Sequence, residues 1–567
     1  MLVALIDVLG TALDYALLML REWWLLLGII AFALAGPPLP RFFTRLGDAL
    51  ESFASRPWRA ALTAGALCLL WTGVAMAIRG RIPPPIMHDD LACYLGAQMF
   101  AEGYAAYPTH PLWPHFEQFH VLMVPSFASK YPIGNELLMA LALRLTGIAL
   151  IGSWLAAGAA CMGIFWTLRA AFVLPGVPGS QPGTNDGLRA RLSRGNAWAF
   201  AGACAAAIHP VMLDFSHSYR GGGLAALGGA LLFGATLRIA DAPTARLGAI
   251  AGAGLAMLAM SRPYEGVVLA IGCAIALLLH RRRGLLLPAA ACLGVTALGL
   301  VPVALHNRAV TGSVTTLPWA EYARQYDPAP QFVWQKPVPI PKYRNEEFRF
   351  VYERLYRTKF DRVTAPGGLL AELDRKQYFI QWMLAGDPES RITPFLWPLF
   401  LIPFVMLPRV LREDRNARMA AIVVLVFLFA PFSMFVNLLV HYLAPVTAAV
   451  VVLMLLLVRA LRWQWLAVAI AIALVVNAAM VIRWHPGGWE PRQRLEAQVG
   501  AGRHLFLVAP DVHDMLYNDP DIDAQRVVWA RDLGDNRALL AYYKDRQVWR
   551  VLPGVRRAES PSLQRVR

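Results

Sequence analysis

His88-Asp-Asp-Leu-Ala-Cys-Tyr-Leu-Gly-Ala-Gln-Met-Phe-Ala-Glu-Gly103 follows a hydrophobic run that ends near Ala77. It begins with two adjacent carboxylates, Asp89 and Asp90, and opens a loop rich in Pro, His and Trp. Carboxylates are readily solvated at a membrane surface, so this position alone predicts no function. The pair gains meaning from the rest of the chain, because several other isolated polar residues are predicted to lie on the same side of a membrane.

The composition is typical of a membrane protein. Of the 567 residues, 57% are hydrophobic and 16% are charged, whereas soluble domains carry about 25% charged residues. Apolar runs of roughly 16–20 residues recur between Arg-rich turns, which predicts membrane-spanning helices. The short alternating segments of a transmembrane β-barrel are not seen. The six cysteines include no CxxC spacing, so the sequence predicts neither a disulfide framework nor a cysteine metal site.

The net charge of +16 indicates the orientation of the helices. Arginines cluster at the ends of the predicted spans, a pattern typical of cytoplasmic helix ends rather than of nucleic-acid binding. Four arginines between residues 37 and 59 place that segment inside, so the next span carries Asp89 and Asp90 to the outer side. Arginines in later loops repeat the pattern and support the same topology.

We therefore predict a polytopic α-helical membrane protein with about 11–13 transmembrane helices. After a helix at 1–20 and a short span at 22–36, we expect spans at 59–78, 150–172, 196–213, 221–239, 246–260, 265–280, 285–303, 393–411, 419–437, 442–459 and 465–482. The apolar part of 134–147 is too short to cross a membrane. A juxtamembrane helix on the outer face at 134–147 keeps the arginines of 169–194 inside.

These elements divide the chain into five parts. Residues 1–58 hold the N-terminal helices and an inner linker, and residues 59–303 form the helical core with its first outer loop at 79–149. Residues 304–392 form a large outer loop with helical runs at 346–362 and 369–382, and residues 393–482 hold the last spans. Residues 483–567 are predicted to form a small outer α/β domain, with strands at 504–508, 527–530 and 548–552 and a helix at 538–545.

Isolated polar residues gather at the predicted outer ends of the helices. Besides Asp89 and Asp90, the candidates for a substrate site are Lys130, Tyr131, His209, Asp214, Arg220, Arg262, Glu265, His441 and Tyr442. Arg220 and Arg262 break the positive-inside pattern, although a charge costs about 2.5–3.5 kcal/mol at the centre of a membrane helix. Acids and several cations on one face suit a phosphate-bearing substrate, because cations bind phosphate oxygens and a carboxylate accepts a hydroxyl proton.

Several other features have structural interpretations. The histidines match no metal-ligand spacing, so no metal site is predicted. Four tryptophans fit an interfacial aromatic belt: Trp113, Trp319, Trp382 and Trp397. The acidic segment 511–523 lacks the EF-hand spacing, and we expect a solvated loop there. The run Gly221-Gly-Gly223 is expected to permit close packing of helices.

Segments of the first outer loop carry a family resemblance. They are Asp89-Asp90, Ala97-Gln-Met-Phe-Ala-Glu-Gly103, Pro108-Thr-His-Pro-Leu-Trp113, Phe116-Glu-Gln-Phe-His120 and Lys130-Tyr-Pro132. Together they resemble the first loop of bacterial GT-C-type membrane glycosyltransferases, the group of protein mannosyltransferases and lipid A aminoarabinose transferases. The helical core before residue 304 is similar in layout, whereas Ile133 stands where the family usually has a second Pro.

The resemblance implies a sugar donor carried on polyprenyl phosphate and used on the periplasmic side of the bacterial inner membrane. It implies that Asp89 is the catalytic carboxylate, with Asp90 at the neighbouring acidic position. It further implies that Lys130 contacts the donor phosphate and that Asp214 matches an outer acidic position of a later helix pair. No cofactor is then required, and a divalent metal is optional, because the donor supplies its own charged leaving group.

The predicted function is transfer of a hexosyl or pentosyl group to a periplasmic glycolipid, polysaccharide or protein, by an enzyme of the lipid bilayer without a nucleic-acid partner. One alternative is a lipid-linked sugar transporter or flippase, which needs a polar path that the predicted spans do not offer. Another is a membrane scaffold whose tail binds carbohydrate or a partner. The sequence leaves open the sugar, the acceptor, the oligomeric state, and whether Asp89 or Asp90 is the base.

Overall fold

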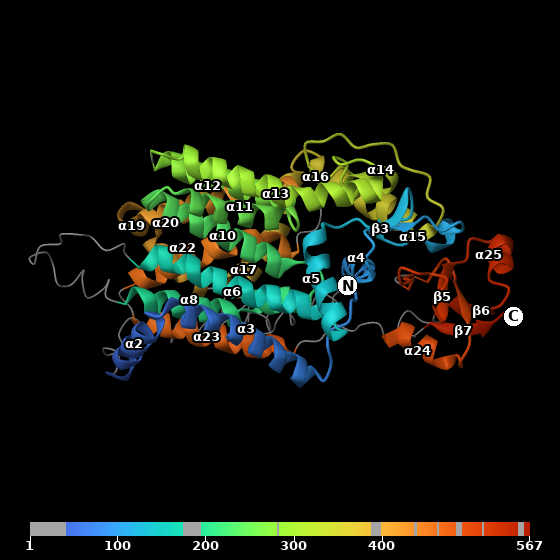
Figure 1. The fold of residues 1–567 in the computed structure, drawn as a ribbon, viewed down its shortest axis with the longest axis horizontal. Coiled ribbons are helices and arrows are strands. Elements are labelled where there is room, and N and C mark those ends of the chain that lie inside the picture. The colour runs from blue at the N-terminus through green and yellow to red at the C-terminus, as the bar shows by residue number, and fades with distance from the viewer. Residues whose placement is uncertain are drawn as a thin grey trace, which may run out of the picture.

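The computed structural model describes residues 41–173, 194–280, 283–386, 399–435, 439–461, 464–483, 490–512, 515–553 and 561–566. Within them the chain forms a bundle of helices that is extended at one end by loop segments and a small sheet domain (Figure 1). The predicted helices at 1–20 and 22–36 lie outside the described residues. The segment expected to be an inner linker contains a helix, α2 (Arg41–Ala54), because its apolar residues recur at helical spacing.

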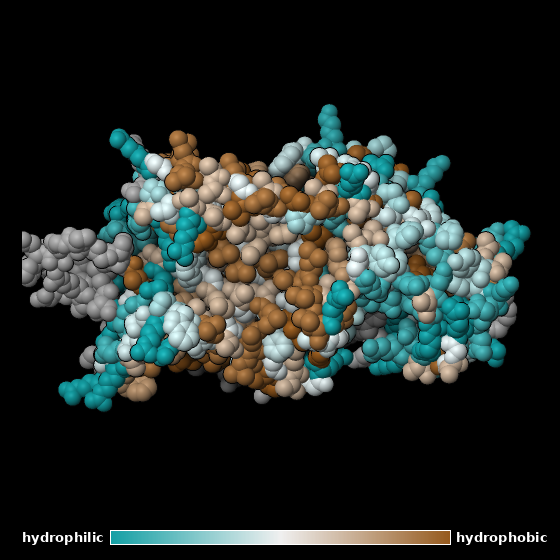
Figure 2. Space-filling model, in the orientation of Figure 1, coloured by the Kyte–Doolittle hydropathy of each residue, from teal (hydrophilic) through white to brown (hydrophobic). Residues whose placement is uncertain are grey.

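Among the described residues, six helical segments are long and apolar enough to cross a membrane. They are α3 (Pro57–Arg79), α6 (Leu150–Phe172), α10 (Gly222–Asp241), α13 (Leu286–Thr311), α20 with α21 (Arg415–Ser433) and η4 with α22 (Val440–Ala460). Shorter apolar helices accompany them: α11 (Ala245–Ala259), α12 (Pro263–Leu279) and α23 (Gln464–Arg483). On the face shown in Figure 2, hydrophobic side chains form a broad band across the bundle and hydrophilic ones gather toward its two ends. These features and the apolar helices confirm the predicted polytopic helical fold.

A seventh candidate span is bent. α8 (Gly195–Ile208) and α9 (Pro210–His217) meet at an angle of 54°. The bend follows from Pro210, because the residue before a proline avoids the helical region and His209 is extended, with ψ of 138°. Of the span predicted at 393–411, only residues from 399 onward are described, and they form η3 (Ile402–Met406) and α19 (Leu407–Glu413) instead of one straight helix.

Small residues bring the central helices close together. A Cβ added at Gly223 of α10 would lie 2.7 Å from the backbone nitrogen of Ala157 on α6. One added at Gly228 would lie 2.8 Å from the carbonyl oxygen of Gly254 on α11. Only glycine allows such close approach of two backbones, which confirms the packing role expected for the glycine run at the start of α10.

The first loop covers one end of the bundle. It comprises α4 (His88–Glu102), β1 (Tyr107–Pro108), η1 (Trp113–Phe116), β2 (Val121–Leu122), β3 (Ser126–Ser129) and α5 (Ile133–Thr146). The strands form a small antiparallel sheet in the order β1-β3-β2, which the sequence did not predict. α5 lies across the ends of the spanning helices (Figure 1) and exposes a row of leucines at positions 137, 141 and 145. Such an apolar face is typical of a helix at a membrane interface, and the predicted juxtamembrane helix is confirmed.

The segment between α13 and α19 packs on the first loop. α13 continues to Thr311, past its predicted end at residue 303, so His306 and Arg308 are helical. The later elements are α14 (Pro318–Tyr326), α15 (Glu346–Phe348), η2 (Arg349–Arg357), α16 (Thr358–Thr364) and α17 (Gly368–Ala385), and both predicted helical runs are confirmed. Aromatic residues join this segment to the first loop, with Phe119 buried against Tyr322, Phe348 and Tyr352.

The C-terminal domain is a sheet with two helices. Its elements are α24 (Glu490–Gln498), β4 (His504–Val508), β5 (Val527–Arg531), α25 (Arg537–Tyr542), β6 (Gln547–Leu552) and β7 (Ser562–Arg565). The strand order is β5-β4-β6-β7, and β4 runs parallel to β5 and β6. The three predicted strands and the helix between the last two are confirmed, whereas β7 was not predicted.

The central strand of this sheet is covered on both faces. Phe506 and Val508 point into the core of the C-terminal domain itself. Leu505 and Leu507 alternate with them and pack against Leu95 of α4 and its neighbours in the first loop. Side chains on successive strand residues point to opposite faces, so the uninterrupted apolar run of β4 reflects these two separate contacts.

Candidate active site

Asp89 and Asp90 lie in the first turn of α4, where the positive end of the helix dipole favours carboxylates. The helix begins after the extended residue Met87 and ends at Gly103, whose φ of 93° is readily adopted only by glycine. Successive residues of a helix point about 100° apart. The two carboxylates therefore enter different surroundings, and they have different properties.

Asp89 is the more accessible of the two acids, with 29% of its side chain exposed. Its carboxylate accepts a hydrogen bond from the Tyr131 hydroxyl and lies 3.5 Å from Nε2 of His120. Burial alone would raise the pKa of Asp89, but His120, the Tyr131 hydroxyl, Arg220 and Lys130 together hold this pKa at about 2. Asp89 is therefore ionised at neutral pH.

Asp90 is turned inward and pairs with Arg220. Only 6% of its side chain is exposed, and Oδ1 lies 3.2 Å from Nε of Arg220. The backbone N–H of Tyr219 also donates to Oδ1, at 3.3 Å. Burial raises the pKa of Asp90, while Arg220 opposes this effect. These contacts make Asp90 the anchor of the Arg220 side chain, and Asp89 is the more exposed of the two carboxylates.

Lys130 places a cation beside Asp89 without pairing tightly with it. The residue is 9% exposed, and its ammonium lies 4.7 Å from the ring centre of Tyr322 and 5.4 Å from that of Tyr131. Among the described residues no carboxylate or carbonyl oxygen accepts a hydrogen bond from this ammonium. Burial lowers the pKa of Lys130 to about 8, although Asp89 and Asp327 act in the opposite direction. The ammonium thus retains its donors for an anionic ligand.

Two later turns bring further polar groups to the same place. Nη2 of Arg262 donates to the carbonyl of Arg220 at 3.3 Å, and the Arg262 guanidinium lies 4.6 Å from the ring centre of Tyr442. His441 stacks on Tyr442, with ring centres 4.9 Å apart. Glu265 is buried in the first turn of α12, close in sequence to Arg262. The structure thus joins the turns before α10, α12 and α22 to the first loop.

The other two predicted residues have different surroundings. Nδ1 of His209 accepts a hydrogen bond from the backbone of Val211 and caps α9, while its Nε2 lies 3.4 Å from the carbonyl of Leu384 on α17. These contacts give His209 a place at the junction of α8, α9 and α17. Asp214 lies on α9. Burial alone would lower the pKa of Arg220, but Asp90 and then Asp214 raise this pKa above its ordinary value. Among the described residues, no three His, Cys, Asp or Glu side chains are grouped to hold a metal ion.

His120 was not among the predicted site residues. Its φ of 64° places it in the left-handed region, which costs a non-glycine residue on the order of 1–3 kcal/mol. Two hydrogen bonds hold this conformation: its N–H donates to the Tyr322 hydroxyl at 2.9 Å, and its carbonyl accepts from the N–H of Lys130 at 3.1 Å. Burial and Lys130 lower the pKa of His120 well below its usual value, while Asp89 acts in the opposite direction.

Glu136 is a second residue that sequence analysis missed. It lies on α5, is 1% exposed, and packs its carboxyl group against Gly96 of α4, where a Cβ would overlap it. Neither oxygen makes a hydrogen bond of good geometry to a described residue, although the Ser129 hydroxyl is near enough to moderate the effect of burial. Burial raises the pKa of Glu136 well above its usual value. The Glu136 side chain therefore packs α4 on α5.

The C-terminal domain reaches the site through Arg531 at the end of β5. Nε of Arg531 donates to the carbonyl of Glu117 in the first loop at 2.7 Å. Its Nη1 lies 2.6 Å from Glu347 of α15, and 8% and 7% of the two side chains are exposed. Its own carbonyl lies 2.9 Å from Nδ1 of His115. One buried arginine therefore ties together three parts of the chain that are far apart in the sequence.

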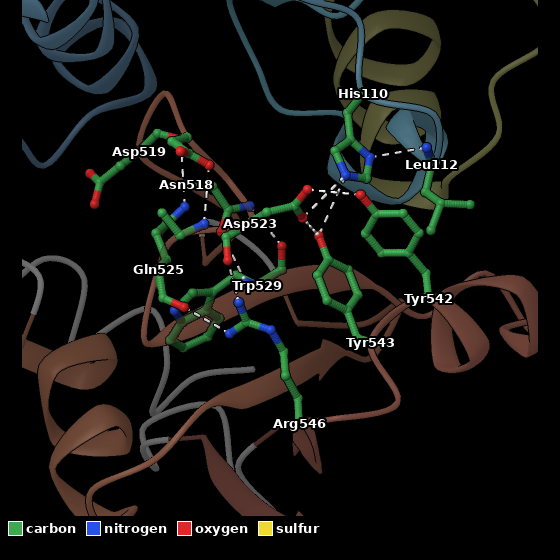
Figure 3. A network of polar contacts seen from close by, with 12 residues as sticks. His110, Leu112, Asn518, Asp519, Asp523, Gln525, Trp529, Tyr542, Tyr543 and Arg546 are labelled. Carbon is green, nitrogen blue, oxygen red and sulfur yellow. Dashed lines mark hydrogen bonds and ion pairs between the residues drawn. The ribbon is translucent and has the colours of Figure 1, made fainter.

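The described part of the acidic segment 511–523 is a loop with exposed acids, as expected, and two of these acids also contact other parts of the chain. Asp523 lies 3.4 Å from Nε2 of His110 and accepts hydrogen bonds from Tyr542 and Tyr543 (Figure 3). Asp519 accepts from Nε2 of Gln98 on α4 at 2.8 Å. The sequence did not predict these contacts, because the partners lie in the first loop and in α25, and no spacing in the acidic segment reveals them.

Comparison with known proteins gives structural neighbours only. The search finds no protein-family model and no curated protein that matches this sequence. Two crystal structures of ArnT from Cupriavidus metallidurans match this chain. The apo form is 13% identical, and the match covers 88% of this chain and 93% of that chain with a TM-score of 0.46. The form bound to undecaprenyl phosphate is 14% identical, and the match covers 86% of this chain and 92% of that chain with a TM-score of 0.44. The apo Archaeoglobus fulgidus oligosaccharyltransferase matches at 13% identity over 77% of this chain and 57% of that chain, with a TM-score of 0.45.

ArnT and the oligosaccharyltransferase are both GT-C glycosyltransferases, the group that the first loop resembles. Because the identities are so low, the activity of this chain is argued below from the site itself.

Proposed function

We propose that this protein is an inner-membrane glycosyltransferase that moves a sugar from a polyprenyl-phosphate donor to a hydroxyl group of a periplasmic acceptor. One observation carries the proposal. Asp89 presents an ionised and accessible carboxylate near the buried ammonium of Lys130. No described carboxylate or carbonyl oxygen accepts a hydrogen bond from this ammonium. Such a site holds a proton acceptor and an anion-binding group side by side.

The cations suit the phosphate of the donor. Lys130, Arg220 and Arg262 come from three different segments and lie around the carboxylates of α4. Arg220 uses Nε toward Asp90, and an arginine has five N–H donors in all, so its remaining donors can bind phosphate oxygens. Positive charge at the phosphate stabilises the negative charge that develops there as the sugar departs.

The transfer then balances as follows. The acceptor oxygen forms a bond to C1 of the sugar, and the bond between C1 and the phosphate oxygen breaks. The electron pair of that bond stays on polyprenyl phosphate, where the cations hold it. The acceptor hydroxyl becomes strongly acidic as its oxygen bonds to carbon, so its proton passes to Asp89 although the pKa of this carboxyl group is only about 2. Asp90 serves indirectly, by orienting Arg220.

Replacement of Asp89 tests the proposal. The purified protein in liposomes is supplied with polyprenyl-phosphate mannose, glucose or arabinose and with an envelope extract as acceptor, and release of polyprenyl phosphate is measured. Asp89→Asn should lower the rate by about 100-fold or more, as loss of a general base does. Asp535→Asn removes a carboxylate that is 65% exposed in the C-terminal domain and serves as the matched control. Full activity of Asp89→Asn, or passage of labelled lipid-linked sugar across the bilayer without transfer, would overturn the assignment.

A further inference from the structure

A separate cleft lies between the first loop and the segment after α14. Its volume is about 360 Å³, within the range of small-molecule sites. Trp113 and Val124 of the first loop form one wall, and Tyr326 of α14, Tyr343 and Phe348 form the other. We expected Trp113 in an interfacial aromatic belt, but it lies in this wall. The guanidinium of Arg344 lies over its ring, 4.5 Å from the ring centre.

One layer of aromatic rings separates this cleft from Asp89. Phe348 lines the cleft and stacks on Phe119, with ring centres 4.4 Å apart and planes 8° apart. Phe119 directly precedes His120, whose ring faces Asp89. The cleft therefore adjoins the candidate active site without being part of it, and a ligand in the cleft contacts none of the proposed transfer residues.

The lining of the cleft combines rings with polar groups. Tryptophan and tyrosine side chains present flat apolar faces together with N–H and O–H groups at their edges. Gln325 and Glu117 also line the cleft, and their hydrogen bonds to Val124, Tyr326 and Arg344 join its two walls. A saccharide has the matching combination, because its ring carries apolar C–H faces and a rim of hydroxyl groups.

The charge at the mouth of the cleft is positive. Glu117 is only 2% exposed, and its oxygens accept hydrogen bonds from Tyr326, Arg344 and Asn345, so its charge is held within the wall. The Arg344 side chain is half exposed and retains further N–H donors. Lys342 is exposed at the rim and forms no ion pair with a described residue. The described lining residues thus offer two cationic groups and no exposed carboxylate at the mouth.

We propose that this cleft binds a saccharide that carries a carboxylate or phosphate group, as a part of the acceptor remote from the hydroxyl that reacts. The rings contact the sugar, and Lys342 and Arg344 bind the acidic group. The identification of this saccharide as the acceptor rests on the proposed function, whereas binding itself requires no transfer.

Calorimetric titration of the full-length protein tests the inference. The protein carries Asp89→Asn, so that no transfer takes place, and the probes are a glucuronyl disaccharide, a disaccharide phosphate, maltose and an acidic tetrapeptide. At least one of the two acidic disaccharides should bind ten-fold more tightly than maltose, and its identity distinguishes a carboxylate from a phosphate ligand. Lys342→Glu should weaken this binding by at least ten-fold. Lys336→Glu, at the other end of the same proline-rich run and exposed outside the cleft, should change it by less than two-fold.

Three results would overturn the inference: no saturable binding of either acidic disaccharide, equal effects of the two lysine substitutions, or tighter binding of the peptide than of either saccharide. Both lysines are exposed, so their replacement should leave folding intact. A protein that transfers sugar normally but fails this titration would refute the cleft alone. A protein that binds the saccharide but, with Asp89 restored, transfers nothing would refute the proposed function alone.

Discussion

Lys130 allows stability and activity to be separated, because raising the pH should change them in opposite directions. Burial lowers the pKa of this ammonium from its ordinary value of 10.5 to about 8. Between these two values the unfolded chain binds more protons than the folded chain, so the free energy of unfolding rises with pH across this window. At about 1.4 kcal/mol per pKa unit, the shift corresponds to about 3 kcal/mol of destabilisation that is fully present below pH 8 and absent above 10.5.

Activity should follow the opposite trend. If the Lys130 ammonium binds the donor phosphate, its loss of charge weakens binding, and kcat/KM should decline above about pH 8. Lys130→Arg keeps a positive charge throughout this range, because the pKa of arginine is above 12. The alkaline decline should therefore disappear in Lys130→Arg. Lys130→Met removes the charge without adding polar groups, so it should lose activity at every pH.

Two measurements check these expectations. The pH profile of kcat/KM is recorded for the wild type and Lys130→Arg from about pH 6.5 to about pH 10, a range that brackets the pKa of Lys130. Thermal unfolding in detergent is recorded for the wild type and Lys130→Met across pH 7 to 10.5, where the variant should be more stable at neutral pH and the difference should vanish at the alkaline end. A stability difference that does not shrink, or an alkaline decline that persists unchanged in Lys130→Arg, would refute the reasoning.

Three further predictions concern groups around the site. Asp90→Asn leaves Arg220 without its buried counter-charge and should destabilise the protein by about 3–5 kcal/mol in denaturation measurements; a stability equal to that of the wild type would contradict the pairing. His120→Asn should unfold within about 1 kcal/mol of the wild type, because asparagine tolerates the left-handed region, while His120→Ala should be less stable than His120→Asn; equal losses would show that the backbone conformation is not the cause. Arg531→Ala should lower the free energy of unfolding by about 3–5 kcal/mol and expose the C-terminal domain to limited proteolysis. The double replacement Arg531→Met with Glu347→Leu should recover most of this stability. Proteolysis of Arg531→Ala as slow as that of the wild type would exclude the proposed link.

The sequence was most informative where one property repeats along the chain. Hydropathy and arginine placement located the spanning helices, because the membrane imposes length and charge asymmetry on each of them separately. Short apolar runs likewise predicted the strands of the C-terminal sheet. The candidate site was predictable in part, since isolated charges such as Arg220 and Arg262 are conspicuous at helix ends. Their mutual contacts stay beyond single-sequence analysis.

Other features have no signature in the sequence. The left-handed conformation of His120 is held by the Tyr322 hydroxyl of α14 and by the N–H of Lys130, ten residues further along the first loop. Arg531 ends an ordinary apolar strand, and nothing beside it indicates Glu347 as its partner. The strand β4 reads as fully buried, but its sequence does not say what covers either face. In each case a property of one residue is set by tertiary contacts, and local spacing cannot predict them.

The C-terminal domain is better understood as part of the candidate site than as an appendage. One face of its sheet buries Leu91, Leu95 and Met99 of α4, so the helix that carries Asp89 is packed between the sheet and the rest of the first loop. Asp89 can occupy a defined position only if α4 does, because a helix transmits a displacement along its whole length. The domain therefore stabilises the geometry of a carboxylate that none of its own residues contacts through a described hydrogen bond or ion pair. Arg531 likewise stabilises the wall of the neighbouring cleft. It binds the backbone of Glu117, and its guanidinium lies 5.5 Å from the ring centre of Phe348.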